Sequence, residues 1–155
     1  MNAHGRATMK AAVLVDVNRL EVRDVPRVDP APHEVLVRVE AVGLCGTDVH
    51  IVEGHANYNA DERGRLRSLR ESPQILGHEI AGVVAECGSA VRELAPGDRV
   101  IATSYELGVS HFGGFAELAR VRADWVLPLP AGMSLREAMV IGTATLTGVG
   151  FLATV

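Results

Sequence analysis

The chain has 155 residues, of which 48% are hydrophobic and 22% charged, a composition that supports a packed core and argues against intrinsic disorder. Its net charge of −4 and isoelectric point of about 5.8 argue against a nucleic-acid-binding domain, which carries clustered Lys and Arg. The sequence has no uninterrupted apolar run of transmembrane length and no apolar signal segment at its N-terminus, so we expect a cytoplasmic protein without a membrane partner, with reduced cysteines.

Short strands are predicted along the first part of the chain. The segment 9–15 is apolar and rich in Val, and the segments 20–25 and 34–44 alternate with the period of two that is typical of half-buried strands. Three prolines make 26–34 a loop. The stretch 55–73 is crowded with Arg, Glu and Asp, which favours a solvated surface loop; a substrate-facing role for its arginines is the alternative.

The middle of the chain continues the pattern of short strands. Further strands are predicted at 78–86, 98–102, 113–121 and 125–130, separated by turns that contain Gly and Pro. Closely spaced strands without long helices between them are typical of a barrel or a sandwich rather than of a parallel βαβ sheet. The sequence therefore predicts a mainly β fold.

The character of the sequence changes near residue 134. Ser134 is a plausible helix N-cap, and Glu137 stands three residues later, at the capping-box spacing. From about Leu135 to Val155 the sequence is apolar on all sides, as in a buried helix. Because nothing follows Val155 to cover this tail, we expect the chain to stop in mid-structure and to self-associate through the tail unless it folds back on the β-domain.

Two motifs contain residue types that bind zinc. Cys45 lies in "GLCGTDVH", directly after a predicted strand, and His78 and Glu79 stand side by side in "LGHEIAG". A catalytic zinc takes three protein ligands from Cys, His and carboxylate side chains and leaves one position open. Neighbouring residues of a strand point in opposite directions, so His78 and Glu79 share an ion only if the backbone turns there. Glu79 is therefore more naturally an outer group or an occasional ligand.

The other cysteine and histidines give weaker signals. Cys87 ends a predicted strand, and we interpret it as a buried structural thiol. His33 and His55 lie in predicted turns or loops, and His111 lies in a Gly-rich stretch; all three are interpreted as loop residues.

Four motifs together resemble the medium-chain dehydrogenase/reductase superfamily. "GLCGTDVH", "LGHEIAGVV", "PGDRV" and "GGFAEL" are similar to the landmarks of its GroES-like catalytic domain, in the same order. The resemblance implies a GroES-like, partly open barrel with short helices over residues 8–133. It also implies that residues 134–155 begin a helical connection toward a cofactor domain.

The front part is most similar to a zinc-dependent alcohol dehydrogenase. The resemblance implies that Cys45 and His78 are ligands of a catalytic Zn²⁺, with Glu79 next to the metal. It also implies that the Thr47 hydroxyl binds the alcohol, and that His50 ends a proton relay. The implied substrate is a small alcohol or carbonyl compound. The implied cofactor is NAD or NADP, which requires a Rossmann domain.

The sequence departs from that pattern in ways that keep other functions open. The region after 98–102 has no cysteine, which excludes the four-cysteine structural zinc lobe of many relatives, and Thr143 stands where the third zinc ligand is expected. The back part resembles the zinc-free quinone oxidoreductase and acryloyl-CoA reductase branch. The closing "TGVGFLATV" is not the Gly-rich fingerprint of a Rossmann domain, so we expect that domain to be absent.

Three functional hypotheses follow from these features. The first is the catalytic domain of a zinc-type alcohol dehydrogenase, which is not competent alone. The second is a domain of a zinc-free NADPH reductase for a quinone or an enoyl thioester. The third is a non-enzymatic GroES-like module that binds a partner through its apolar tail.

Overall fold

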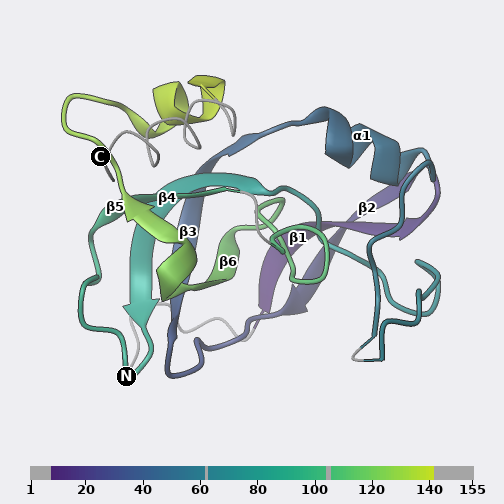
Figure 1. The fold of residues 1–155 in the computed structure, drawn as a ribbon, viewed down its shortest axis with the longest axis horizontal. Helices are drawn as coiled ribbons and strands as arrows, with labels where there is room; N and C mark the ends of the chain where they lie inside the picture. The colour runs from purple at the N-terminus through teal and green to yellow at the C-terminus, as the bar shows by residue number, and fades with distance from the viewer. Residues whose placement is uncertain (1–7, 62, 104–105, 142–155) are drawn as a thin grey trace.

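The computed structural model describes residues 8–61, 63–103 and 106–141. This part of the chain is mainly β, as predicted (Figure 1). In chain order the elements are β1 (Thr8–Asp16), β2 (Arg19–Pro26), β3 (Glu34–Gly43), α1 (Gly46–Val52), β4 (Glu79–Cys87), β5 (Arg99–Thr103), β6 (Leu118–Arg122), a 3₁₀ turn at Ala123–Trp125, β7 (Val126–Pro128), and a helical segment at 135–141.

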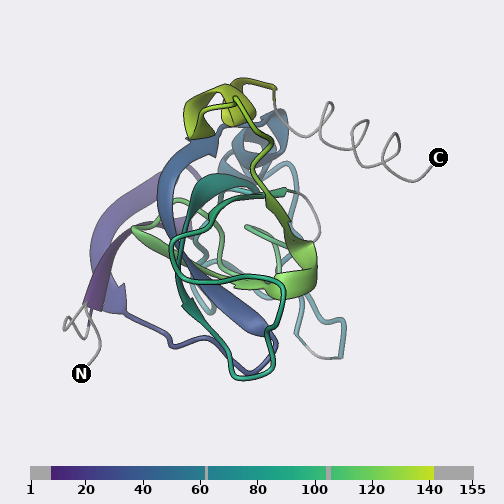
Figure 2. The same ribbon diagram turned by 90° about the vertical axis from the view of Figure 1, so that its left-hand side faces the viewer.

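The strands form two open sheets. β1 and β2 form a two-stranded hairpin, and the second sheet has five strands in the order β6-β3-β4-β5-β7. Every pairing between these strands is antiparallel, so the described residues contain no βαβ unit of a Rossmann domain. The larger sheet is strongly curved around its core (Figure 2), but β6 and β7 remain as edges and no barrel closes in the described part of the chain.

The main core lies on the concave side of the five-stranded sheet. Alternating positions of the strands supply it, in keeping with the period-two pattern of the sequence. Its buried members are Val35, Val37, Ile80, Val84, Val100, Ala102, Leu107, Ala119, Val121 and Val126. Each large aliphatic side chain buried here contributes roughly 1.5–3 kcal/mol. Cys87 packs against this cluster as a free thiol but is only partly buried, so it is less buried than the sequence suggested.

The strand predicted at 113–121 is shorter than the sequence suggested. Only Leu118–Arg122 forms a strand, because Gly113 and Gly114 turn toward the segment that precedes β4. Their N–H groups donate to Ile75 O at 2.7 Å and to Gly77 O at 2.8 Å. A Cβ atom on Gly113 would lie 2.3 Å from Gly77 O, so this close approach requires glycine. The contact fixes the backbone next to His78.

The structure contains the predicted loop at 55–73 and the predicted start of the C-terminal helix. Residues 55–73 contain no helix or strand element among the described positions, as predicted. Ser134 and Glu137 form the predicted capping box, with hydrogen bonds of 3.1 and 2.8 Å. The helical segment 135–141 folds back on the sheet through its buried Ala138 and Met139. Residues 142–155, which include Thr143 and the rest of the apolar tail, lie outside the described residues.

None of the helices in the described part of the chain is long and apolar enough to cross a membrane.

Candidate metal centre

Cys45 lies where β3 passes into α1. It is the N-cap of α1, in extended conformation at φ −104° and ψ 159°, so its side chain stands at the open end of the helix. The Cys45 N–H donates to the Asp48 carboxylate at 3.0 Å, which closes the first turn. The Thr47 hydroxyl oxygen lies 3.9 Å from Cys45 Sγ. The local fold therefore presents a thiol and a hydroxyl side by side.

His78 and Glu79 stand at the start of β4. Gly77 precedes them at φ +94°, a left-handed conformation that turns the chain just before the strand. The sequence suggested that both side chains can face one ion only if the backbone turns at this point, and it does turn. Ligand atoms of Cys45, His78 and Glu79 lie within 4.8 Å of one another. The structure thus brings together the three residues of the predicted metal site.

Gly43 leaves the space that the Glu79 carboxylate occupies. Gly43 pairs with Glu79 across β3 and β4, and a Cβ atom on Gly43 would lie 2.1 Å from Glu79 Oε2. Glu79 is itself buried, with 7% of its surface exposed. One thiol, one imidazole and one carboxylate on rigid strand and helix ends form a donor set that suits Zn²⁺. The residues present therefore fit the metal that the resemblance implies.

Asp48 is a buried residue of the site that sequence reasoning missed. Only 1% of its surface is exposed, and its Oδ1 accepts the Gly77 N–H at 3.1 Å. The same oxygen lies 3.5 Å from His78 Nδ1. A carboxylate that holds the outer nitrogen of an imidazole ligand is typical of zinc sites. Asp48 stands three residues after the N-cap, at the position from which a carboxylate can accept a hydrogen bond from the N-cap N–H. This spacing is the signal that could have identified it.

The charges of the site stabilise one another. The hydrogen bond with Asp48 raises the pKa of His78 to about 9, against the opposing effect of burial. Burial alone would raise the pKa of Asp48, but hydrogen bonds from His78 and from the Cys45 N–H lower it below its ordinary value. The Thr47 N–H and then His78 lower the pKa of the Cys45 thiol. These contacts therefore make the Cys45 thiol easier to deprotonate than an isolated cysteine, and the thiolate is the form that binds zinc.

His50 is placed apart from this cluster. It lies in the last turn of α1, exposed to solvent, with its ring 6.0 Å from the ring of His55 between centroids. Together with Glu53 and His55 it forms a separate cluster. The site thus contains Thr47 beside Cys45, whereas His50 stands at the surface, where a proton relay would end.

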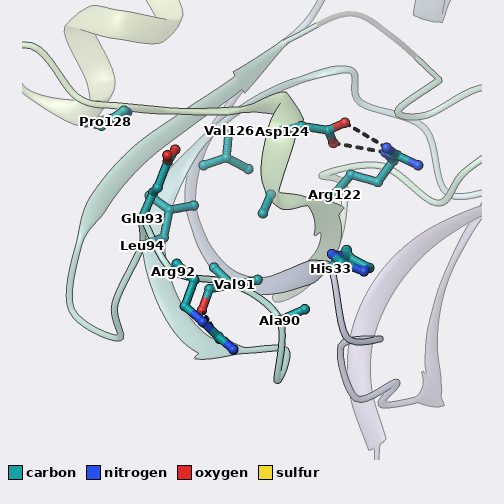
Figure 3. A pocket seen from close by; sticks show the side chains of 11 residues that line it. His33, Ala90, Val91, Arg92, Glu93, Leu94, Arg122, Asp124, Val126 and Pro128 are labelled. Carbon is teal, nitrogen blue, oxygen red and sulfur yellow. Dashed lines mark hydrogen bonds and ion pairs between the residues drawn. The ribbon is translucent and has the colours of Figure 1, made fainter.

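A cavity lies elsewhere in the molecule, away from the metal cluster. It has a volume of about 420 Å³ and lies between the β4–β5 connection and β7, where Arg122 and Asp124 form an ion pair (Figure 3). None of the five predicted site residues lines this cavity. It therefore gives no support to a substrate site next to Cys45.

Several known proteins to which this chain is similar are dehydrogenases and reductases. Sorbitol dehydrogenase of Bacillus subtilis is 32% identical over 159 residues, which cover 86% of this chain and 42% of that protein. Acrylyl-CoA reductase of Ruegeria pomeroyi is 42% identical over 79 residues, which cover 51% of this chain and 23% of that protein. An alcohol dehydrogenase superfamily protein from Novosphingobium aromaticivorans has a crystal structure that matches with a TM-score of 0.76 at 32% identity, over 90% of this chain and 40% of that one.

The chain spans less than half the length of each of these proteins. The alcohol dehydrogenase GroES-like domain family matches residues 31–131, the part that contains β3, α1, β4 and the metal cluster. The chain therefore belongs to the alcohol dehydrogenase GroES-like domain family, within the medium-chain dehydrogenase/reductase superfamily.

Proposed function

We propose that this chain forms the zinc- and substrate-binding part of an NAD(P)-dependent dehydrogenase that interconverts an alcohol and an aldehyde or ketone. The observation that carries the proposal is the cluster of Cys45, His78 and Glu79, whose ligand atoms lie within 4.8 Å of one another. The buried Asp48 supports it, because its carboxylate faces His78 Nδ1 and so leaves Nε2 of the imidazole for the metal.

Each residue of the cluster has a separate task in this proposal. Cys45, His78 and Glu79 would hold the ion, which when bound supplies Lewis-acid polarisation of the substrate oxygen. Thr47, whose Oγ1 lies 3.9 Å from Cys45 Sγ, would accept the alcohol proton and pass it toward the surface. The exposed His50, three residues later on α1, would release that proton to solvent.

Hydride transfer needs a nicotinamide held against the substrate. The described residues contain no parallel βαβ unit that would bind a dinucleotide at its Gly-rich turn. We therefore propose that NAD or NADP is supplied on a Rossmann domain, and that residues 8–141 do not catalyse the reaction by themselves. The sequence places Thr143 where the third zinc ligand is expected, which predicts a weak or missing ligand at that position. Thr143 lies outside the described residues.

One observation favours a second candidate function. The 42% identity with an acrylyl-CoA reductase over 79 residues supports a zinc-free NADPH reductase of a quinone or an enoyl thioester. In that case the cluster would hold no ion, and the thiol would have no part in polarising a substrate.

The test uses the complete chain loaded with Co²⁺, which takes the place of zinc and reports on its ligands through visible absorption. Adding a primary alcohol is expected to shift these bands, because the alcohol oxygen enters the open position. Thr47→Val should retain the bands and respond more weakly to alcohol. A chain that binds no metal, or a metal whose spectrum alcohol leaves unchanged in the wild type, would reject the zinc-dependent function and favour the zinc-free reductase.

A further inference from the structure

The C-terminal end of α1 is closed by a turn that places two histidines together. The His55 N–H donates to His50 O at 2.8 Å, and the Gly54 N–H donates to Ile51 O at 3.1 Å. This pair of bonds is the Schellman motif, with Glu53 as the helix C-cap. In this motif the side chains at the positions of His50 and His55 usually make an apolar contact, but here both are imidazoles.

The turn is fixed rather than adaptable. Gly54 has φ +78°, and a Cβ atom on it would lie 2.9 Å from Val17 Cγ2. A side chain at residue 54 would therefore suffer both backbone strain and a steric clash. The turn, which favours glycine at residue 54, therefore sets the positions of the His50 and His55 backbones relative to each other.

We propose that His50, Glu53 and His55 form a second, surface-exposed site for a divalent transition-metal ion, with Zn²⁺ as the ion that their chemistry suits. The ligand atoms of the three residues lie within 4.8 Å of one another. His55 Nδ1 is 3.3 Å from Glu53 Oε2, and the rings of His50 and His55 are 6.0 Å apart between centroids.

Ligand chemistry and geometry both agree with this assignment. Two imidazoles and one carboxylate are donors that Zn²⁺, Ni²⁺ and Cu²⁺ accept, with water in the open position. Tetrahedral zinc with bonds near 2.1 Å needs ligand atoms about 3.4 Å apart. The Glu53 and His55 side chains are 45% and 68% exposed, so they are free to close this gap by rotation about their own side-chain bonds.

The proposed site is distinct from the cluster at Cys45. His50 stands five positions after Cys45, the N-cap of α1, and five steps of an α-helix amount to about 7.5 Å along the axis and about 140° around it. The two sites also differ in chemistry, because the second one has no thiol. If the proposed function holds, an ion on His50 would withdraw that imidazole from the proton relay; this consequence rests on the proposed function, whereas binding of the metal does not.

Calorimetric titration with Zn²⁺ alone tests the site in the complete chain. The variant Cys45→Ser/His78→Ala removes the first cluster and should still bind one equivalent of zinc. Adding His55→Ala to this background should lower the remaining zinc affinity at least about tenfold. Loss of a residue that only supports a metal ligand already lowers metal affinity by about that factor. Adding His33→Ala instead, which removes another exposed imidazole, should leave the binding unchanged.

A second measurement needs no substitution and so does not depend on whether the variants fold. With one equivalent of Zn²⁺ already bound at the cluster of Cys45, a further substoichiometric addition of Cu²⁺ should broaden the imidazole NMR signals of His50 and His55 in the wild-type chain, while those of His33 and His111 stay sharp. Saturable zinc binding that His55→Ala leaves intact, or uniform broadening of all surface histidines by Cu²⁺, would overturn the proposal. Absence of any zinc binding in the Cys45→Ser/His78→Ala chain, with His50 and His55 unaffected by Cu²⁺, would overturn it as well.

Discussion

Replacing Asp48 should damage both the fold and the metal site. Its carboxylate accepts the Cys45 N–H at 3.0 Å and the Gly77 N–H at 3.1 Å, and it is only 1% exposed. A buried donor that loses its acceptor destabilises the fold by about 1–3 kcal/mol. Asp48→Ala leaves two buried N–H groups without an acceptor, so it should lower the free energy of unfolding by roughly 2–6 kcal/mol. This is a large part of the about 5–15 kcal/mol that stabilises a typical domain.

Asp48→Asn is the sharper variant, because it keeps the volume and one acceptor oxygen. It leaves one of the two N–H groups facing an NH₂ group, so the free energy of unfolding should fall by about 1–3 kcal/mol. The amide also gives His78 a weaker partner, and zinc affinity should fall on the order of 10–100-fold. Urea denaturation in the presence of a chelator measures the first effect, and zinc titration by calorimetry measures the second.

The matched control is Asp124→Asn, which also removes a carboxylate that is paired with a cation. Asp124 lies 2.7 Å from Arg122 and its side chain is 60% exposed, so replacing it should leave both the free energy of unfolding and the zinc affinity close to those of the wild type. If Asp48→Asn unfolds at the same urea concentration as the wild type and binds zinc equally well, the role assigned to this carboxylate is wrong.

Two further predictions concern the same site. Gly43→Ala should sharply weaken zinc binding in a titration, because the new methyl group would lie 2.1 Å from Glu79 Oε2. The control Gly46→Ala should leave zinc binding unchanged, because no atom lies within 4 Å of its new methyl group. Hydrogen bonding to Asp48 raises the pKa of His78 from 6.5 to about 9, so in the metal-free chain this pair stabilises the fold fully below about pH 6.5, and the contribution is lost as the pH rises through 9. The difference in unfolding free energy between wild type and Asp48→Asn should therefore shrink over that range in urea titrations, and a constant difference would contradict the assigned pair.

Much of the fold could be predicted because its sequence signals are local. Alternating Val residues identified β3, and the Ser134–Glu137 spacing identified the helix start that the structure shows. The strand predicted at 113–121 failed in its first half, because the path of those glycines is set by contacts with the segment 75–77, which lies far away in the sequence. Such long-range contacts leave no periodic pattern.

The sequence predicted the metal ligands of the candidate site, but not the residue that holds them in place. Cys45 and His78 were recognisable from the motifs that contain them, and the Gly77 turn then explained how Glu79 can join them. Asp48 escaped attention because a lone acid in a helix usually faces solvent, and only the fold shows that it is buried between Cys45 and His78. Its role depends on two segments that meet only in three dimensions.

The most direct test of the central claim is the thiolate-to-metal charge-transfer absorption of the Co²⁺-loaded chain. Of the two cysteines, Cys45 lies in the metal cluster, whereas the Cys87 thiol donates to Leu94 O at 3.4 Å in the main core. If Cys45 binds the metal, the wild type and Cys87→Ser should both show a strong near-ultraviolet band, and Cys45→Ser should lose it completely. A wild-type chain without the band, or a Cys45→Ser chain that keeps it, would contradict the claim that Cys45 binds the metal.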